Sequence, residues 1–177
     1  MTGVQTCALP IYAAGDTTFI GKVGDTTALT SLTTDASTVA GSPAVGVGTT
    51  WIKGGVVTTT GAQTYNDAVK LDVLDVTLTS TAPGANASTG SGNGNITFAK
   101  TLDGAQNLTI NTAGDTIFLG KVGDLIALTS LTTDASTVAG TPAVGLGTTW
   151  IKGGVVTTTG TQTYNDAVRI EIGRAHV

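Results

Sequence analysis

The sequence predicts an all-β fold, and within that class a fragment of a right-handed parallel β-helix, a β-solenoid in which short strands stack coil on coil. Three observations favour it: a composition rich in Thr and Gly and poor in charge, short apolar runs separated by turn residues, and a long internal repeat. Together they indicate many short strands packed against one another rather than helices around one compact core.

The composition differs from that of an ordinary globular enzyme. Charged residues are 11% of the chain, against about a quarter in a typical globular protein, and 25 of the 177 residues are Gly. A β-branched, turn-rich chain suits short strands joined by tight turns. The formal net charge of -4 and the scattered Lys and Arg disfavour nucleic-acid binding, which needs clustered cations. No run approaches the roughly 18 apolar residues of a membrane helix, so we expect no membrane insertion by this segment.

The two ends of the chain do not match its middle. Residues 1–11 and 172–177 can be read back as codon strings that are reverse complements of each other, and both resemble translated sequencing-adapter sequence. We therefore expect residues 1–11 and 172–177 to be adapter-derived and residues 12–171 to be the protein itself. Because Met1, Cys7 and His176 lie in these ends, the remainder has no thiol nucleophile, imidazole base or soft metal ligand.

An internal repeat organises the remainder. Gly15-Asp16-Thr17 recurs as Gly114-Asp115-Thr116, an offset of 114 − 15 = 99 residues. The register then holds without a gap, so that residues 14–71 match residues 113–170 with 9 of 58 positions different. Most exchanges are mild, but Thr26-Thr27 becomes Leu125-Ile126. An exchange of Thr for an aliphatic residue at two adjacent positions predicts that this site is at least partly exposed.

Short apolar or alternating runs recur at intervals of about nine to twelve residues, separated by Gly, Asn or Asp. Apolar and polar residues alternate in residues 95–98 and 107–110, the pattern of a strand with one buried face. In a β-helix the inward aliphatic and aromatic residues form a continuous core, while outward Thr forms a solvated face. At roughly 20 residues per coil, the repeat is predicted to make about five coils.

The alternative fold is a row of tandem immunoglobulin-like β-sandwiches, because 99 residues is also the length of one such domain. Short strands and small, evenly spread core residues favour the β-helix. A run from Ala82 to Asn95, rich in Gly, Ser and Asn, is predicted to be a loop that projects from one coil.

Several segments resemble the modules of long bacterial β-strand-repeat surface proteins, which are similar to filamentous-haemagglutinin-like adhesins and autotransporter passenger regions. The segments that carry the resemblance are residues 95–98, 103–110, 128–135 and 159–168. It covers residues 13–171. The resemblance implies a structural or adhesive repeat segment of a large bacterial cell-surface or secreted protein, located outside the cell and acting as an extended stalk.

The residues themselves indicate no catalytic, cofactor-binding or metal site, and we expect no enzyme. Asp16, Asp25, Asp35, Asp67 and their repeat partners are read as turn residues, because the Gly-Gly-x-Gly-x-Asp nonapeptide of calcium-binding β-rolls is missing. A glycosidase would need two acids held across a cleft. The Asp residues recur with the repeat, whereas active sites are rarely duplicated in tandem.

Trp51, Trp150, Tyr65 and Tyr164 are candidate ligand contacts, because an aromatic ring presents an apolar face to a sugar. The alternative is that these rings fill or cap the core of a coil. The expected partners are neighbouring repeats of the same chain. An alternative function, a carbohydrate- or host-ligand-binding module, would add surface glycans or host proteins.

Overall fold

The computed structural model describes residues 8–11, 13, 15–35, 48–82, 94–134 and 147–171. Within these residues the protein is all-β, with sixteen strands and no helix, and this confirms the predicted fold class. The strands form three sheets, and every described pairing is parallel. An immunoglobulin-like sandwich pairs its strands antiparallel, so the alternative of tandem sandwiches is wrong for the described residues.

Each sheet is named here by a letter, with its strands in spatial order. Sheet A contains β1 (Ala8–Ile11), β3 (Ser31–Thr34), β6 (Gln63–Tyr65), β9 (Ile96–Phe98), β12 (Thr116–Phe118), β14 (Thr148–Ile151) and β16 (Ala167–Ile170). Sheet B contains β10 (Leu102–Asp103), β7 (Ala68–Leu71), β4 (Thr49–Ile52) and β2 (Thr17–Phe19). Sheet C contains β15 (Gln162–Tyr164), β13 (Ser130–Thr133), β11 (Asn107–Thr112), β8 (Asp75–Ser80) and β5 (Val56–Thr59).

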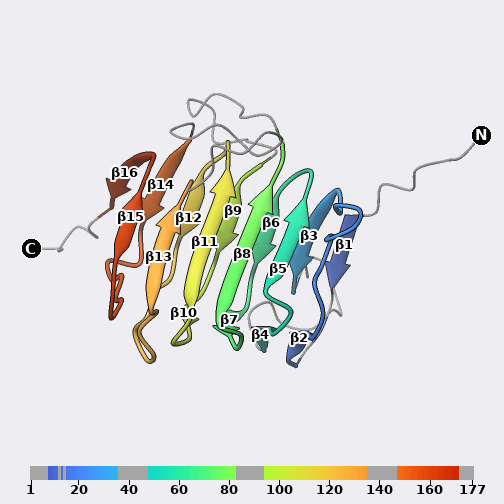
Figure 1. The fold of residues 1–177 in the computed structure, drawn as a ribbon, viewed down its shortest axis with the longest axis horizontal. Helices are drawn as coiled ribbons and strands as arrows, with labels where there is room; N and C mark the ends of the chain where they lie inside the picture. The colour runs from blue at the N-terminus through green and yellow to red at the C-terminus, as the bar shows by residue number, and fades with distance from the viewer. Residues whose placement is uncertain are drawn as a thin grey trace, which may run out of the picture.

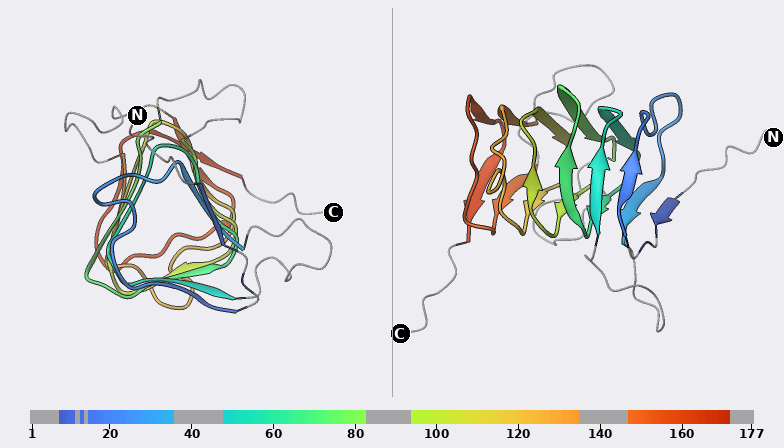
Figure 2. Two further views of the ribbon diagram at one scale, coloured as in Figure 1. Left: turned by 90° about the vertical axis from the view of Figure 1, so that its right-hand side faces the viewer. Right: turned by 90° about the horizontal axis from the view of Figure 1, so that it is seen from below.

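The three sheets line the sides of one stack. Seen end-on the stack has a three-sided outline, and seen from the side its strands lie one beside the next (Figures 1 and 2). The chain runs from sheet A to sheet B to sheet C and back to sheet A; one such passage is called a circuit below. For example, β4 lies in sheet B, β5 in sheet C, β6 in sheet A and β7 again in sheet B.

The core lies inside the stack, where alternate residues of each strand point inward. In β7 and β8 the pattern of exposure alternates along the strand, with Val69, Leu71, Val76 and Leu78 buried. In-register parallel pairing also stacks similar side chains from one strand to the next. In sheet A, Tyr65 pairs with Phe98 and Phe98 with Phe118, and their ring centroids are 5.2 and 5.3 Å apart. These three rings form a continuous aromatic ladder.

The strand that lies last in sheet A leaves its inward face uncovered. Val168 and Ile170 of β16 are 41% and 63% exposed, whereas the matching Val69 and Leu71 of β7 are 0% and 4% exposed. The difference arises because β7 has a neighbour on each side, β4 and β10, whereas β14 is the single partner of β16 among the described strands. Burial of these positions therefore depends on a following strand and not on local sequence.

The two copies of the repeat lie on different faces of the stack. The series β2, β4 and β7 is in sheet B, and the matching series β12, β14 and β16 is in sheet A. Between β4 and β14 the chain returns to sheet B three times, at β7, at β10 and at the bridge residue Val122, and then passes sheet C to reach sheet A. One repeat thus makes three and two-thirds circuits, which rotates the second copy by about 120° in a three-sided stack.

The predicted five coils per repeat is therefore wrong. Circuits are unequal in length: Thr17 pairs with Thr50 and Thr50 with Val69, which are separations of 50 − 17 = 33 and 69 − 50 = 19 residues. The estimate of about 20 residues holds only for the shorter circuits. The longer circuits include residues 36–47, 83–93 and 135–146, which lie outside the described residues.

The exchange of Thr26-Thr27 for Leu125-Ile126 falls at an exposed corner, as predicted, with Leu125 78% and Ile126 47% exposed. The predicted projecting loop, Ala82 to Asn95, lies almost wholly outside the described residues.

Within residues 1–11, β1 pairs with β3, and Leu9 and Ile11 pack against the core. Any alternating apolar segment can extend a parallel sheet in this way, and the adapter origin of residues 1–11 stays a prediction.

Candidate functional site

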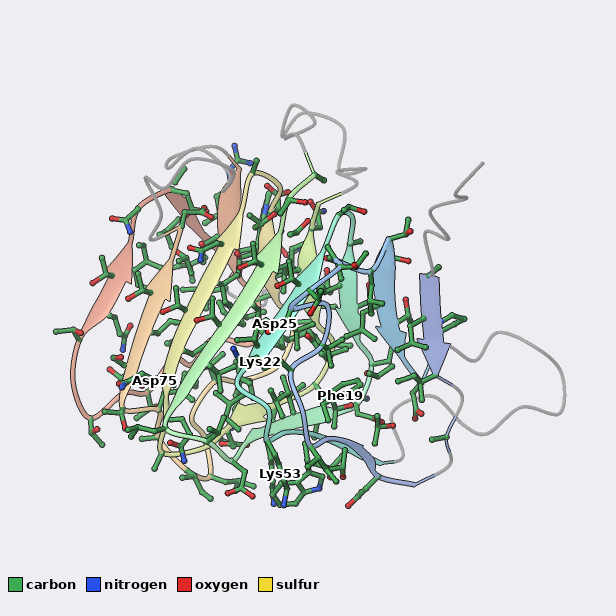
Figure 3. All side chains as sticks on the ribbon, turned by 45° about the vertical axis from the view of Figure 1, so that its right-hand side comes forward. Phe19, Lys22, Asp25, Lys53 and Asp75 are labelled. Atoms are coloured by element: carbon green, nitrogen blue, oxygen red, sulfur yellow. The ribbon has the colours of Figure 1, made fainter. Side chains whose placement is uncertain are left out.

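Trp51 lies on the outer side of sheet B, because strand alternation turns its neighbour Ile52 inward. Its indole Nε1 donates a hydrogen bond to Oδ2 of Asp16 at 3.1 Å, and the other oxygen of that carboxylate accepts the amide of Thr49 at 3.0 Å. The Nζ atoms of Lys53 and Lys70 are 5.2 and 5.0 Å from the ring centroid. Figure 3 shows Lys53 on the outside of the molecule. The indole is thus half-buried, fixed by a carboxylate and flanked by two cations.

The second copy reproduces this cluster on sheet A. Trp150 Nε1 donates to Oδ2 of Asp115 at 3.3 Å, and the ring centroid is 4.8 Å from Nζ of Lys152 and 5.0 Å from the guanidinium carbon of Arg169. Arg169 stands where the first copy has Lys70, so the exchange preserves the cation over the ring. A cation placed over an indole is attracted by the ring quadrupole, which stabilises the arrangement by about 0.5–1 kcal/mol at an exposed site.

Each cluster offers a ligand an indole edge between two positive charges rather than a bare aromatic face. Lys53 also pairs with Asp72 at 3.0 Å, and Lys152 with Glu171 at 3.2 Å. Cations packed around a fixed ring compete with a neutral sugar for the face of the indole. Because the copies lie in sheets B and A, the two clusters point to different sides of the stack.

The prediction that Tyr65 contacts a ligand is wrong, because its side chain is fully buried in the aromatic ladder. Its hydroxyl donates to Oε1 of Gln63 at 2.9 Å, and burial raises the pKa of the hydroxyl. Tyr164 occupies the matching position near the uncovered end of the stack and is only half-buried there. Burial also raises the pKa of the Tyr164 hydroxyl. The alternative reading, that these rings fill or cap the core, fits both tyrosines.

A shallow depression of about 520 Å³ lies where the chain passes from sheet A to sheet B. It is lined by Ala68, Ala99, Lys100, Thr101, Gly120, Lys121 and Asp124. Its lining combines small residues with two lysines and one acid. Lys121 is engaged by Asp124 at 3.0 Å, an exposed ion pair whose contribution to stability is slight.

Two pairs of carboxyl groups lie at corners of the stack; Asp35, Asp67 and Asp134 are buried, and Asp166 is partly buried. Asp35 follows β3 with a positive φ of 48°, and Asp67 precedes β7; both side chains are buried. The amide of Gly48 donates to Oδ1 of Asp67 at 3.2 Å, and the hydroxyl of Thr50 donates to its Oδ2 at 3.3 Å. Desolvation, followed by the hydrogen bond and charge of Asp35, raises the pKa of Asp67 to about 6.

The second copy repeats this arrangement with Asp134 and Asp166. The hydroxyl of Thr149 lies 2.8 and 3.0 Å from the two oxygens of Asp166, and the hydroxyl of Thr133 lies 3.2 Å from Oδ1. The amide of Thr112 donates to Oδ1 of Asp134 at 2.9 Å. Burial is the main cause that raises the pKa of Asp134 to about 7; the Thr112 amide opposes the rise, and the charge of Asp166 adds to it.

Sequence reasoning placed these Asp residues in turns, and their backbones do lie at bends. It missed that four of the side chains point inward and meet in pairs. One available signal was the alternation in β3 and β13, in which Leu32 and Thr34, or Leu131 and Thr133, occupy the buried positions just before the acid.

Across the described ranges, no group of three or more His, Cys, Asp or Glu side chains could share a metal ion. No helix in those ranges could cross a membrane. No protein-family model, curated protein or solved structure matches the chain. Function is therefore argued from the architecture and from the two duplicated clusters.

Proposed function

We propose that this segment is a right-handed β-solenoid that serves as a non-catalytic, extended stalk in a large bacterial cell-surface or secreted protein. Its work is mechanical: it sets the distance between whatever it is anchored to and whatever it carries. Neighbouring repeats of the same chain are its principal partners.

The observation that carries this proposal is that both copies of the repeat add strands to the same three parallel sheets. Each copy supplies three successive strands to one sheet, and the second series continues the stack begun by the first. In such an architecture each coil buries its apolar edge only against its neighbours, and so length is set by the number of repeats. The exposure of Val168 and Ile170 in the last strand illustrates this dependence.

Chains carrying two, three and four copies of the 99-residue unit test the stalk. With strands about 4.8 Å apart, three and two-thirds circuits add about 18 Å of length per repeat at constant width. Small-angle scattering and negative-stain electron microscopy measure both quantities. Particles that widen with copy number, or that resemble beads joined by flexible linkers, would refute the stalk.

A second function, ligand binding, is favoured by one specific observation, the fixed and half-exposed indoles of Trp51 and Trp150. Trp fluorescence against a glycan panel that includes carboxylated and sulfated glycans measures binding. Lys70→Ala combined with Arg169→Ala removes one cation from each ring and should weaken any response. A flat response across the panel in the unsubstituted protein would exclude glycans as ligands.

A further inference from the structure

The acid pairs present a problem of charge, because three of their four side chains are buried and Asp166 is partly buried. Two carboxylates taken out of water repel each other, and each carries a desolvation penalty of several kcal/mol unless a positive charge compensates it. Among the described residues, Asp67 and Asp166 contact amide and hydroxyl groups, together with the other acid of the pair. No Lys or Arg is among these partners. Each pair therefore concentrates negative charge that a bound cation would offset.

Unpartnered oxygen atoms beside each pair supply a second, independent observation. Within the described residues, Thr17 Oγ1, Thr34 Oγ1 and Thr116 Oγ1 have no hydrogen-bond partner, and neither has Asp134 Oδ2. All four residues are more than nine-tenths buried. Native proteins rarely leave such groups unsatisfied, and a bound ion is one of the accepted ways to satisfy them.

These free atoms belong to the same corners as the acids. Thr17 pairs with Thr50 across sheet B, and the hydroxyl of Thr50 contacts Asp67. Thr34 directly precedes Asp35. In the second copy, Thr116 pairs with Thr149, whose hydroxyl contacts Asp166.

The hydroxyl of Thr133, the counterpart of Thr34, is 3.1 Å from that of Thr149 and 3.2 Å from Asp166. The second corner thus holds two carboxylates with the hydroxyls of Thr133 and Thr149 beside Asp166, and Thr116 lies on the adjoining strand; the first corner has the matching residues, and both donor sets consist of oxygen only.

We propose that each of the two corners binds one divalent cation of the hard, oxygen-preferring class, with Ca²⁺ as the first probe, through the pairs Asp35 with Asp67 and Asp134 with Asp166. Hard cations take oxygen ligands from carboxylates and from neutral oxygen donors. One divalent ion neutralises both acids of a pair, whereas one shared proton leaves a net negative charge inside the stack. Because each site joins two successive circuits, the bound ions act as cross-braces along the stack.

Terbium luminescence in the full chain tests the sites directly. Tb³⁺ substitutes for Ca²⁺ and is excited through nearby tyrosine. Tyr65 pairs with Thr34 and Tyr164 with Thr133, so each corner has a tyrosine beside it. The expected result is tyrosine-sensitised emission that saturates at two ions per chain, is displaced by Ca²⁺, and is accompanied by a rise in Tm on adding Ca²⁺ to chelator-treated protein.

Neutral isosteres separate the two sites. Asp67→Asn and Asp166→Asn should each remove one of the two ions, and the double variant should lose at least tenfold in Tb³⁺ affinity and all of the Ca²⁺-dependent rise in Tm. In chelator the same variants should melt at a higher temperature than the unsubstituted chain, because like-charge repulsion is relieved. Asp25→Asn is the matched control, since this exposed acid pairs with Lys22 (Figure 3).

Two outcomes would overturn the proposal. If neither Ca²⁺ nor Tb³⁺ binds and both Asn variants are more stable in every buffer, each pair holds a shared proton instead of a metal ion. If Tb³⁺ emission survives in the double variant but falls in Asp25→Asn, binding is adventitious at surface carboxylates.

Discussion

Phe98 is the middle ring of the aromatic ladder, and its removal should be among the most destabilising single changes in the chain. The ring is 1% exposed and lies between Tyr65 and Phe118, with interplanar angles of 11° and 17°. Replacing a buried Phe by Ala costs about 3–5 kcal/mol, and each aromatic pair contributes about 0.5–1.5 kcal/mol beyond its buried area. Since two aromatic pairs are lost here, the loss of stability caused by Phe98→Ala should lie near the upper end of this range, at about 4–5 kcal/mol.

Urea unfolding followed by far-ultraviolet circular dichroism measures this loss through the midpoint and slope of the transition. Phe98→Leu keeps most of the volume and should cost about 1–2 kcal/mol, so it gives a measurable value even if the Ala variant does not fold. Ile20→Ala is the surface control, because Ile20 is 79% exposed and its loss should change stability by less than about 0.5 kcal/mol. A cost for Phe98→Ala as small as that of Ile20→Ala would refute an enclosed aromatic ladder.

Three further predictions follow from the geometry of the stack. Val69→Ala should cost about 2 kcal/mol by urea unfolding, whereas Val168→Ala, the same change in the same local sequence at the uncovered end, should cost less than half as much; equal costs would contradict the role of the neighbouring strand. Because burial raises the pKa of Asp134 to about 7 from an ordinary value near 3.8, its proton stabilises the folded state fully below about pH 4, and this contribution is lost as the pH rises through 7. In chelator, the Tm of the unsubstituted chain relative to that of Asp134→Asn should therefore decrease as the pH rises from 4 to 8. A Tm difference that does not change with pH would show that the pKa of Asp134 is not raised. Spin labels on Lys53→Cys and Lys152→Cys should be separated by clearly more than the roughly 18 Å expected if both copies lay on one face, and a distance near that value would disprove the rotation of the repeat.

The candidate surface site was partly readable from the sequence. In β4 the apolar Ile52 must face inward, so alternation alone turns Trp51 outward. No such rule applied to Tyr65, because the position two residues before it, Gln63, is polar and yet buried. The amide nitrogen of Gln63 donates to the carbonyl oxygen of Thr79 at 2.9 Å, a partner 16 residues away that only the fold brings near. A buried polar network of this kind leaves no periodic signal.

Composition and local patterns were enough to predict the all-β class, the repeat and its register, the exposed corner at residues 125–126, and the absence of imidazole and thiol chemistry between residues 12 and 171. These properties follow from composition and from patterns of period two, which are local. Only the tertiary structure decided which face each copy occupies and which side chains meet at the corners. The reason is that the number of residues in a circuit varies. Thr17 and its strand partner Thr50 are 33 residues apart, whereas Thr50 and its partner Val69 are 19 residues apart. Two nearly identical segments can therefore lie on different sheets, and acids 32 residues apart, Asp35 and Asp67, can share one buried corner.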